Sequence, residues 1–389
     1  MQIIIKLTTI CNLNCVYCSE GDKPAATLAE EDVYKLINEL PELLDTYHDK
    51  SITLLWHGGE PMTVGTPYLD RIMAYAEKIL DGYDLRFLMQ TNLTLLNDDW
   101  IQLLLKYNVG IGVSLDGYKE LHDENRKGKG GKPTFDLIVD NLKKLQRNEI
   151  KCGILMVLNT EVPIDIDKLY DLIKMLGCDI KIHPVIPCGR AANNLHAKEI
   201  YDNYIEVLKL IFVKCMEDME DDVNIEPINS LLRAILTDGT VRECSFNGSC
   251  GKGFMCMYAT GEIGFCGRAE TEALLLGYGN IKTGRLKDIY ESVNAQKIRD
   301  RQKFLKENSC KACLDWKLCH GGCAFEAINA FGTLEATYPH CESRHKFIDF
   351  LKTTGLQMLK RRLIKEKEAY KEIIQIRKDI LSEIGNQKQ

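Results

Sequence analysis

The sequence predicts an α/β protein in which a partial, TIM-like (β/α)6 barrel precedes a cysteine-rich domain and a C-terminal helix. Short runs rich in β-branched residues alternate with longer amphipathic segments over residues 1–190. Nine of the 16 cysteines lie between positions 244 and 341, where regular periodicity is weak. An apolar stripe at helical spacing runs from about Phe347 to Ile384. These three features define the expected order of domains.

Six strands alternate with six helices in the first part of the chain. The strands are expected at Ile3–Leu7, Ile52–Trp56, Leu85–Gln90, Val109–Leu115, Cys152–Leu158 and Ile180–Ile186. The helices are expected at Glu30–Leu44, Tyr68–Leu80, Asp98–Tyr107, Phe135–Gln146, Ile166–Leu176 and Ile200–Glu217. Because the crossovers between successive strands share one hand, the strands should be parallel. Six units are too few for a closed eight-stranded barrel, and functional loops are expected at the strands' carboxyl ends.

Composition and charge divide the chain into four parts. We expect the barrel over residues 1–218, a linker over 219–240, a cysteine-rich domain over 241–345 and a basic amphipathic helix over 346–389. The acidic stretch Glu217–Asp222 marks the start of the linker. An interruption of that helix is expected near Thr353–Gly355. The net charge is -6, yet residues 346–389 hold 11 Lys or Arg against 6 Asp or Glu. Positive charge is therefore concentrated in the tail.

The cellular compartment determines how the cysteines are interpreted. The N-terminal residues match no signal peptide, and no stretch reaches the roughly 18 apolar residues that a membrane span needs. A cytoplasmic protein with no membrane or nucleic-acid partner is expected. In a reducing compartment, 16 cysteines indicate metal ligation rather than disulfides.

A first motif lies directly after the first expected strand, where Cys11, Cys15 and Cys18 are spaced by four and three residues. Three thiolates on a four-iron cluster leave one iron open for a small ligand. A zinc knuckle is the alternative. The motif, with the aromatic Tyr17 before its third cysteine, resembles that of the radical S-adenosylmethionine (SAM) superfamily. The resemblance implies a 4Fe-4S cluster whose open iron is chelated by SAM.

Further segments at strand ends match the same superfamily. The Gly58-Gly59-Glu60-Pro61 segment after His57 resembles its GGEP segment, in which the glutamate accepts from the SAM amino group. The resemblance places Ser114 and Asp116, together with Arg126, near SAM, with Arg126 pairing with the SAM carboxylate. A turn cap is the alternative for Asp116, and a solvated loop charge for Arg126. The positions near SAM or substrate also include Asn92, in Gln90-Thr91-Asn92, and Asn159, both equally compatible with structural turns.

The crowded cysteines resemble the SPASM domain, an extension with two auxiliary clusters. The resemblance assigns Cys244, Cys250, Cys266 and Cys323 to a first auxiliary 4Fe-4S cluster. It assigns Cys310, Cys313, Cys319 and Cys341 to a second. Zinc is the alternative for the closely spaced set, since paired cysteines often bind zinc. Without Cys244 as a ligand, the first auxiliary cluster would have an open site.

The remaining cysteines are expected to pack rather than to ligate. Cys256 alternates within a strand-like run, Phe254–Tyr258. Buried apolar filler is expected for the separate cysteines, namely Cys152, Cys178, Cys188 and Cys215.

The resemblance also implies a reaction. An electron donor such as flavodoxin or ferredoxin would drive cleavage of SAM to a 5'-deoxyadenosyl radical, which abstracts hydrogen from a residue of a peptide or protein. One candidate is a maturase that forms a thioether or carbon–carbon crosslink in a ribosomally made precursor peptide. The other is an anaerobic sulfatase-maturing enzyme that makes formylglycine. That family usually has Asp after the third ligand of its first auxiliary cluster, whereas this chain has Gly267-Arg268 after Cys266, which favours the peptide maturase.

Three points stay open in the sequence. No catalytic base is assigned, because His183 and Tyr258 also read as satisfied core residues. Many peptide maturases begin with a winged-helix domain, which is absent before the first strand, so leader recognition is expected elsewhere. The basic residues of the tail, Lys360, Arg361, Arg362, Lys365 and Lys367, would suit an acidic leader or simply be solvated. A non-catalytic electron-transfer protein is the alternative of another class, against which the SAM motifs argue.

Overall fold

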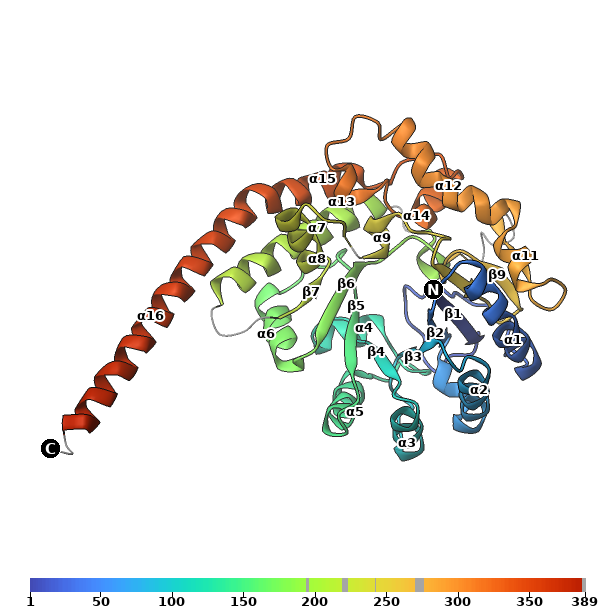
Figure 1. Ribbon diagram of the computed structural model, residues 1–389, viewed down its shortest axis with the longest axis horizontal. Coiled ribbons are helices and arrows are strands. Elements are labelled where there is room, and N and C mark those ends of the chain that lie inside the picture. Colours follow the sequence, from blue (N-terminus) through green and yellow to red (C-terminus); the bar gives the residue numbers. More distant parts are fainter. Residues whose placement is uncertain (194–195, 219–222, 242, 270–275, 387–389) are drawn as a thin grey trace.

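The computed structural model describes residues 1–193, 196–218, 223–241, 243–269 and 276–386. Its central feature is a ten-stranded sheet with the strand order β10-β9-β8-β1-β2-β3-β4-β5-β6-β7. Figure 1 shows the strands fanned out, with helices in an arc around them. The fold is therefore α/β with a parallel sheet, as the sequence predicts.

The six expected strands are present, parallel and in sequence order. They are β1 (Gln2–Thr8), β2 (Ser51–Gly58), β3 (Asp84–Thr91), β4 (Gly110–Ser114), β5 (Cys152–Leu158) and β6 (Asp179–Pro184). The six expected helices are α1 (Glu30–Thr46), α2 (Thr66–Ile79), α3 (Asp98–Lys106), α5 (Phe135–Arg147), α6 (Ile166–Leu176) and α7 (Ala197–Glu217). Strand β1 is buried along almost its whole length, as expected of a strand covered on both faces.

Short helices at the carboxyl ends of the strands escape sequence analysis. They are the 3-10 helices η1 (Pro61–Val64) and η2 (Gly189–Ala191) and the helix α4 (Lys119–Asn125). Each is too short to show a hydrophobic period. They lie in the loops that carry the sequence motifs.

The range 219–240, expected as a linker, contains regular structure in its described part. Residues Ile225–Glu226 form β7, a seventh parallel strand beside β6, and Ile228–Thr237 form α8. Residues 219–222 lie outside the described residues. The domain boundaries themselves remain predictions.

The cysteine-rich region continues the barrel sheet. Its strand β8 (Phe254–Met257) pairs in parallel with β1, with Ile3 opposite Met255. Two antiparallel strands, β9 (Glu262–Gly264) and β10 (Gly279–Asn280), extend this edge. The helices of the region are α9 (Cys244–Asn247), α11 (Leu286–Tyr290), α12 (Val293–Glu307), α13 (Trp316–Cys319) and α14 (Ala324–Phe331).

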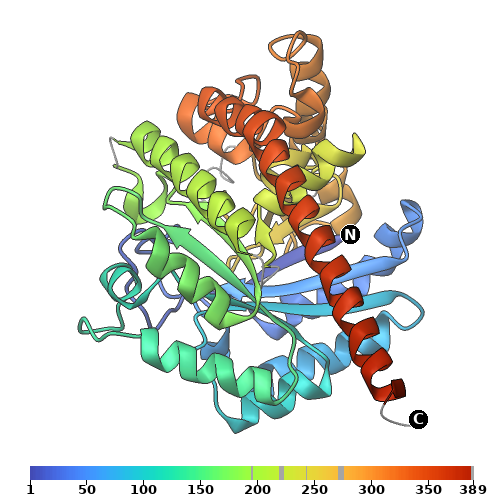
Figure 2. The ribbon, with the colours of Figure 1, turned by 90° about the vertical axis from the view of Figure 1, so that its left-hand side faces the viewer.

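The C-terminal helix is interrupted where the sequence predicts it. Helix α15 (Cys341–Phe350) continues through a π-helical turn, Leu351–Gly355, into α16 (Leu356–Asn386). Figure 1 shows α16 leaving the body of the molecule, and in Figure 2, seen from that side, α16 crosses in front of the rest of the protein. None of the helices in the described ranges combines the length and apolarity that crossing a membrane requires.

Candidate cofactor site

The loop after β1 holds the first three motif cysteines. Cys15 is buried, and Cys11 and Cys18 are half-buried. Burial raises the pKa of the Cys11 thiol to about 11, and negative charge on Glu60, Cys15 and Cys18 acts in the same direction. Such mutual influence requires short distances. The structure therefore brings the three thiols together at the carboxyl end of the sheet.

Two glycines let the end of β2 approach this loop. A Cβ on Gly58, whose φ is +136°, would lie 2.3 Å from the Thr8 carbonyl oxygen. A Cβ on Gly59 would lie 2.4 Å from the Ile10 carbonyl oxygen. Both distances are far below van der Waals contact, so neither position tolerates a side chain. The glycines thus seat the Glu60 segment against the cysteine loop.

The carboxylate of Glu60 is almost fully buried and held by three donors. Its Oε1 accepts from Thr91 Oγ1 at 2.7 Å and from Met62 N at 3.0 Å, and its Oε2 accepts from Asn92 N at 2.7 Å. Burial raises the pKa of this carboxyl. Since a carboxylate accepts about four hydrogen bonds, Oε2 keeps capacity for a further donor such as an amino group.

A buried charged network lies beside the loop. Asp116, fully buried, accepts from Val157 N at 3.0 Å and from the Tyr17 hydroxyl. Arg126 Nη1 donates to the Tyr17 oxygen at 2.8 Å and lies 3.7 Å from Asp116 Oδ2. The Arg126 side chain is 12% exposed, so it is not a solvated loop charge. Asp116 is likewise more than a turn cap.

One atom of this network points to a ligand. The buried Nε of Arg126 has no hydrogen-bond partner among the described residues. A buried guanidinium donor without a partner costs free energy unless an anion or other acceptor meets it. The site therefore fits a ligand with a carboxylate, although the Arg126 assignment stays a prediction.

The other predicted SAM positions already have partners within the protein. Ser114 Oγ accepts from Gln90 Nε2 at 3.0 Å. Asn92 Nδ2 donates to Asn12 Oδ1 at 2.9 Å, and Asn159 Nδ2 donates to Asn125 Oδ1 at 3.4 Å. These bonds account for structural roles, and contacts of these three residues with SAM remain predictions.

The cysteines of the first predicted auxiliary set influence one another. Burial raises the pKa of Cys250 to about 11, and Cys266 adds to this rise. Burial also raises the pKa of Cys323, with contributions from Glu326, Cys250 and Cys266. Cys244 belongs to the same neighbourhood, because it and Cys266 both act on the guanidinium of Arg268. Cys323 therefore lies near Cys250 and Cys266, which are distant in sequence, although Cys319 is only four residues before it.

The second predicted set forms a separate neighbourhood. Burial raises the pKa of Cys310 to about 11, followed by the charges of Cys341, Cys313 and Cys319. The two neighbourhoods coincide with the two ligand sets that the resemblance implies. The ligand assignment itself remains a prediction.

Two buried arginines lie near these cysteines, and neither belongs to a motif that the sequence analysis identified. Arg301 on α12 donates to the carbonyls of Gly321 and Gly322. Its positive charge acts to lower the pKa of Cys250 in the first set and of Cys310 in the second. Arg344 on α15 donates to Cys319 Sγ at 3.5 Å, and its guanidinium lies between the rings of Phe246 and Tyr338. Buried cations stabilise thiolate-rich sites.

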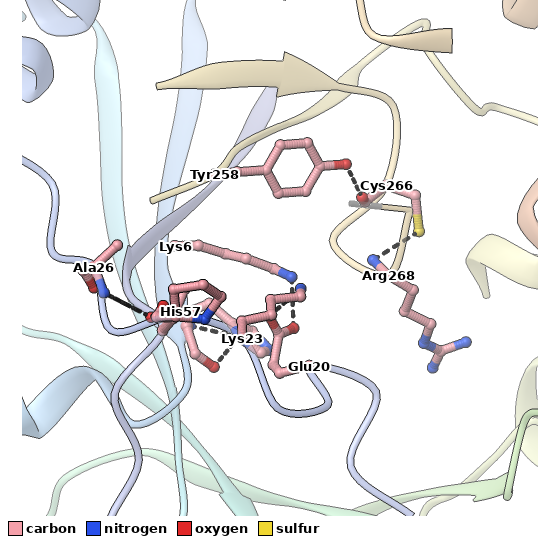
Figure 3. Close-up of polar contacts among 11 residues, drawn as sticks. Lys6, Glu20, Lys23, Ala26, His57, Tyr258, Cys266 and Arg268 are labelled. Atoms are coloured by element: carbon pink, nitrogen blue, oxygen red, sulfur yellow. Dashed lines mark hydrogen bonds and ion pairs between the residues drawn. The ribbon is translucent and has the colours of Figure 1, made fainter. Parts of the chain in front are cut away.

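A polar cluster lies between the barrel and the cysteine-rich region (Figure 3). Its members are Lys6, Glu20, His57, Tyr258 and Arg268. Lys6 Nζ is 2.5 Å from Glu20 Oε1 and 5.3 Å from the centre of the Tyr258 ring. Burial and the nearby Lys6 charge lower the pKa of His57 to about 4, so this imidazole is neutral.

Tyr258, which is fully buried, and His183, which is half-buried, are the two candidates for a catalytic base. The Tyr258 hydroxyl donates to the Cys266 carbonyl at 2.7 Å. Burial, Lys181 and Arg268 lower the pKa of His183. No catalytic base is assigned.

The positions after Cys266 carry no carboxylate. A Cβ on Gly267 would lie 3.2 Å from Ile4 Cδ1 and 3.9 Å from Lys6 Cε. Burial opposes the charge of Arg268, but the thiolates of Cys266, Cys244 and Cys323 raise the pKa of its guanidinium. A cation therefore stands beside the first auxiliary set.

Zinc and iron-sulfur clusters differ in how closely their protein ligands converge. In the ranges that the structure describes, no three His, Cys, Asp or Glu side chains converge closely enough to hold a single metal ion. A tetrahedral zinc site needs such convergence. The thiolates of a four-iron cluster bind different irons and lie further apart.

The cysteines outside these sets differ among themselves. Cys256 is fully buried against Ile4 and Tyr258, as expected of a packed residue. Cys152 and Cys178 were expected as separate buried filler, but both are half-buried and their Sγ atoms lie 3.7 Å apart. The pairing of β5 with β6 brings them together, which two isolated positions in the sequence do not indicate.

Comparison with protein families identifies both parts of the chain. Residues 5–173 match the model of the radical SAM superfamily. Residues 232–314 match that of SPASM, an iron-sulfur cluster-binding domain. The chain therefore contains a radical SAM domain and a SPASM domain. These domains imply 4Fe-4S clusters and SAM as cofactors, and the thiol sets and the Arg126 site fit them.

Similar curated proteins include two anaerobic sulfatase-maturating enzymes. The cysteine-type enzyme of Clostridium novyi is 28% identical over 370 residues, which cover 90% of this chain and 94% of that protein. The serine-type enzyme of Bacteroides thetaiotaomicron is 31% identical over 199 residues, 48% of this chain and 46% of that protein.

Solved structures share the fold. The anSMEcpe protein with bound AdoMet and the Kp18Cys peptide has a TM-score of 0.78 at 21% identity and covers 93% of this chain and 98% of its own. Streptococcus suis SuiB bound to the precursor peptide SuiA has a TM-score of 0.62 at 17% identity and covers 88% and 75%. At these identities the likeness concerns the fold.

Proposed function

We propose that this radical SAM enzyme is a peptide maturase that forms a thioether or carbon–carbon crosslink in a ribosomally made precursor peptide. When bound, the cofactors supply a 5'-deoxyadenosyl radical that abstracts hydrogen from a substrate carbon. The net change in the substrate is the loss of two hydrogens. The protein's part is to hold the substrate beside the site and to exclude water.

The observation that carries this choice is the absence of a carboxylate after Cys266. Gly267 packs against Ile4 and Lys6, and Arg268 follows it. Neither residue accepts a proton at neutral pH. An enzyme that makes formylglycine through a base at this position would need another residue for that step. Crosslinking also releases one proton from the substrate, but that proton need not be taken up at this position.

The proposal includes the cofactor count and the redox partner. Cys11, Cys15 and Cys18 would hold the SAM-binding cluster, with Glu60 and Arg126 facing the amino and carboxylate groups of SAM. The two auxiliary sets would hold two further 4Fe-4S clusters. A flavodoxin or ferredoxin would supply the electron.

Formylglycine formation is the second candidate. Similarity to the Clostridium novyi enzyme over 90% of this chain favours it. The same cofactors would then act on a cysteine or serine of a sulfatase.

One experiment separates the two. Reconstituted protein is incubated with SAM and reductant and either a sulfatase-derived peptide, with Cys or Ser at the target position, or a cysteine-containing precursor peptide encoded beside the gene. We expect loss of two hydrogens from the precursor peptide, with tandem mass spectrometry locating a crosslink. Formylglycine made from Ser has the same mass change as a crosslink, and an aldehyde-reactive hydrazide distinguishes the two. Formylglycine made from Cys loses sulfur and gains oxygen, so its mass alone distinguishes it.

The controls define the outcome. A Cys11, Cys15, Cys18 triple Ala variant should produce neither 5'-deoxyadenosine nor modified peptide. An aldehyde on the sulfatase peptide, with the precursor peptide unchanged, would overturn the proposal in favour of the second candidate. Absence of SAM cleavage would favour a non-catalytic electron-transfer role.

A further inference from the structure

An open apolar groove lies between α8 and the first turns of α16. It is lined by Leu236 of α8 and by Leu356, Leu359, Leu363 and Ile364 of α16, with Lys360 and Lys367 at its border. Its volume is about 320 Å³. The helix α16 continues beyond this point away from the body of the protein (Figure 1). We call this surface the tail groove.

The groove exposes large apolar side chains. Leu236, Leu363 and Ile364 are 59%, 55% and 49% exposed. Single exposed leucines are ordinary, but a contiguous apolar strip with a charged border is typical of an interaction site. Burial of these three side chains would favour binding of a partner that has an apolar face.

The charge around the groove is strongly positive. Residues 356–367 contain five Lys or Arg and one Glu. Arg362 is buried, donates to the Cys215 carbonyl at 2.6 Å and pairs with Glu366, so it fixes α16 onto α7. Lys360, Arg361, Lys365 and Lys367 are exposed. Across the described residues, no ion pair involves any of these four.

These features select the occupant. A second copy of this helix would bring like charges together over residues 356–367, which disfavours a symmetric dimer here. An amphipathic segment with apolar residues on one face and Asp or Glu beside them would cover the leucines and pair with the lysines. We propose that the tail groove binds such an acidic amphipathic segment of the substrate peptide, remote from the residue that is modified. This rests on the proposed function, since it requires a peptide substrate.

The test uses a synthetic probe and the full-length reconstituted protein. The probe is a fluorescein-labelled helical peptide with Leu at i, i+3, i+4 and i+7 and Glu at the flanking positions, compared with the same peptide carrying Lys for Glu. Fluorescence anisotropy should show binding of the Glu peptide that weakens as salt rises. The Lys peptide should bind at least about tenfold more weakly.

Variants locate the site. Leu363→Glu with Ile364→Glu should abolish binding, and Lys360→Glu with Lys367→Glu should reverse the preference toward the Lys peptide. Lys151→Glu reverses one charge at an exposed position before β5 and should leave binding unchanged. Circular dichroism and iron content establish that each variant is folded and loaded.

Three outcomes would overturn the inference: equal binding of both peptides, no binding of either, or dimerisation in sedimentation that the groove variants abolish. The assay needs no turnover. A protein that crosslinks a precursor but binds neither probe refutes only the groove, and one that makes formylglycine refutes only the proposed function.

Discussion

Among single residues, Arg268 carries a positive charge that interacts with three cysteines of the first auxiliary set. The structure places its guanidinium next to Cys244, Cys266 and Cys323. A nearby positive charge stabilises the reduced, more negative state of a cluster. Arg268 is therefore expected to tune electron acceptance by a cluster bound at these cysteines, although no motif contains it.

Replacing Arg268 by Gln should lower the reduction potential of the first auxiliary cluster. A loss of about 1.4 kcal/mol of charge stabilisation corresponds to roughly 60 mV for a one-electron couple. Potentiometric titration followed by electron paramagnetic resonance measures the shift. Arg268→Lys should retain most of the potential, and Arg285→Gln, at an exposed arginine that pairs with Glu42, should change nothing. An unshifted Arg268→Gln potential would place the guanidinium away from the cluster.

A second residue, His122, links the site to pH. Its Nδ1 accepts from Asp116 N at 3.1 Å, and its Nε2 lies 3.0 Å from Thr134 Oγ1. Burial, with a contribution from Arg126, lowers the pKa of His122 to about 3. The imidazole is neutral in the folded protein, whereas the unfolded chain takes up a proton near its usual pKa of about 6.5.

The free energy of unfolding should therefore fall as pH drops below about 6.5. The unfolded state binds more protons in this range, so His122 alone removes about 2 kcal/mol by pH 5. Urea unfolding of the protein at pH 8 and pH 5 measures the difference. His122→Asn, which keeps an acceptor for Asp116 N, should reduce this dependence by the His122 share, whereas His57 and His183 continue to contribute in the same direction. An equal slope in the variant would mean that other groups carry it.

At the scale of elements, β5 and β6 create a dithiol that neither strand has alone. Gly153 is opposite Asp179 in the parallel pair, which brings Cys152 and Cys178 side by side. A hydrogen bond from Cys152 lowers the pKa of the Cys178 thiol to about 7. A substantial fraction of Cys178 is then thiolate at neutral pH, the reactive form.

Mild oxidation with diamide should join Cys152 to Cys178 before it joins other cysteines of the cluster-loaded protein. Their sulfurs, 3.7 Å apart, need only a small movement to reach bonding distance. Peptide mapping under non-reducing conditions detects the linked pair. Cys152→Ser should abolish it, whereas Cys215→Ser should not. Random pairing of cysteines would refute the special reactivity of this dithiol.

The elements also show what the sequence could predict. Helices such as α6 and strands such as β5 have clear periods, and their predicted bounds match the structure. The strand β7 has two residues, too few for any pattern. The pairing of β8 with β1 joins segments far apart in the sequence, and local patterns carry no information about such contacts.

The site likewise contains residues that a local sequence pattern indicates and residues that only the fold brings there. The cysteine spacing indicated Cys11, Cys15 and Cys18, and the resemblance to the radical SAM superfamily indicated the glycines before Glu60. Lys6, Arg301 and Arg344 lie in ordinary strands and helices, and only the fold brings them to the cysteines. A lysine inside an apolar strand, as Lys6 is in β1, was the one signal that could have been noticed.

For the whole molecule, Cys323 should separate the two auxiliary clusters. It follows Cys319 closely in sequence but lies with Cys250 and Cys266. Cys323→Ala and Cys250→Ala should alter the same paramagnetic signal, and Cys310→Ala should alter a different one. Iron content near twelve per wild-type chain gives the reference for three 4Fe-4S clusters. A Cys323→Ala spectrum like that of Cys310→Ala would assign Cys323 to the second cluster.

The parallel pairing of β8 with β1 has a consequence for how this chain is made. The strand that leads to Cys11 leaves the ribosome first, yet its outer neighbour is synthesised about 250 residues later. Until then β1 offers a bare edge of unpaired amides and carbonyls, a template on which nascent chains can aggregate. A chain cut at residue 240 should accordingly be insoluble rather than half active. The cysteine-rich region thus covers the exposed edge of β1 as well as extending the sheet.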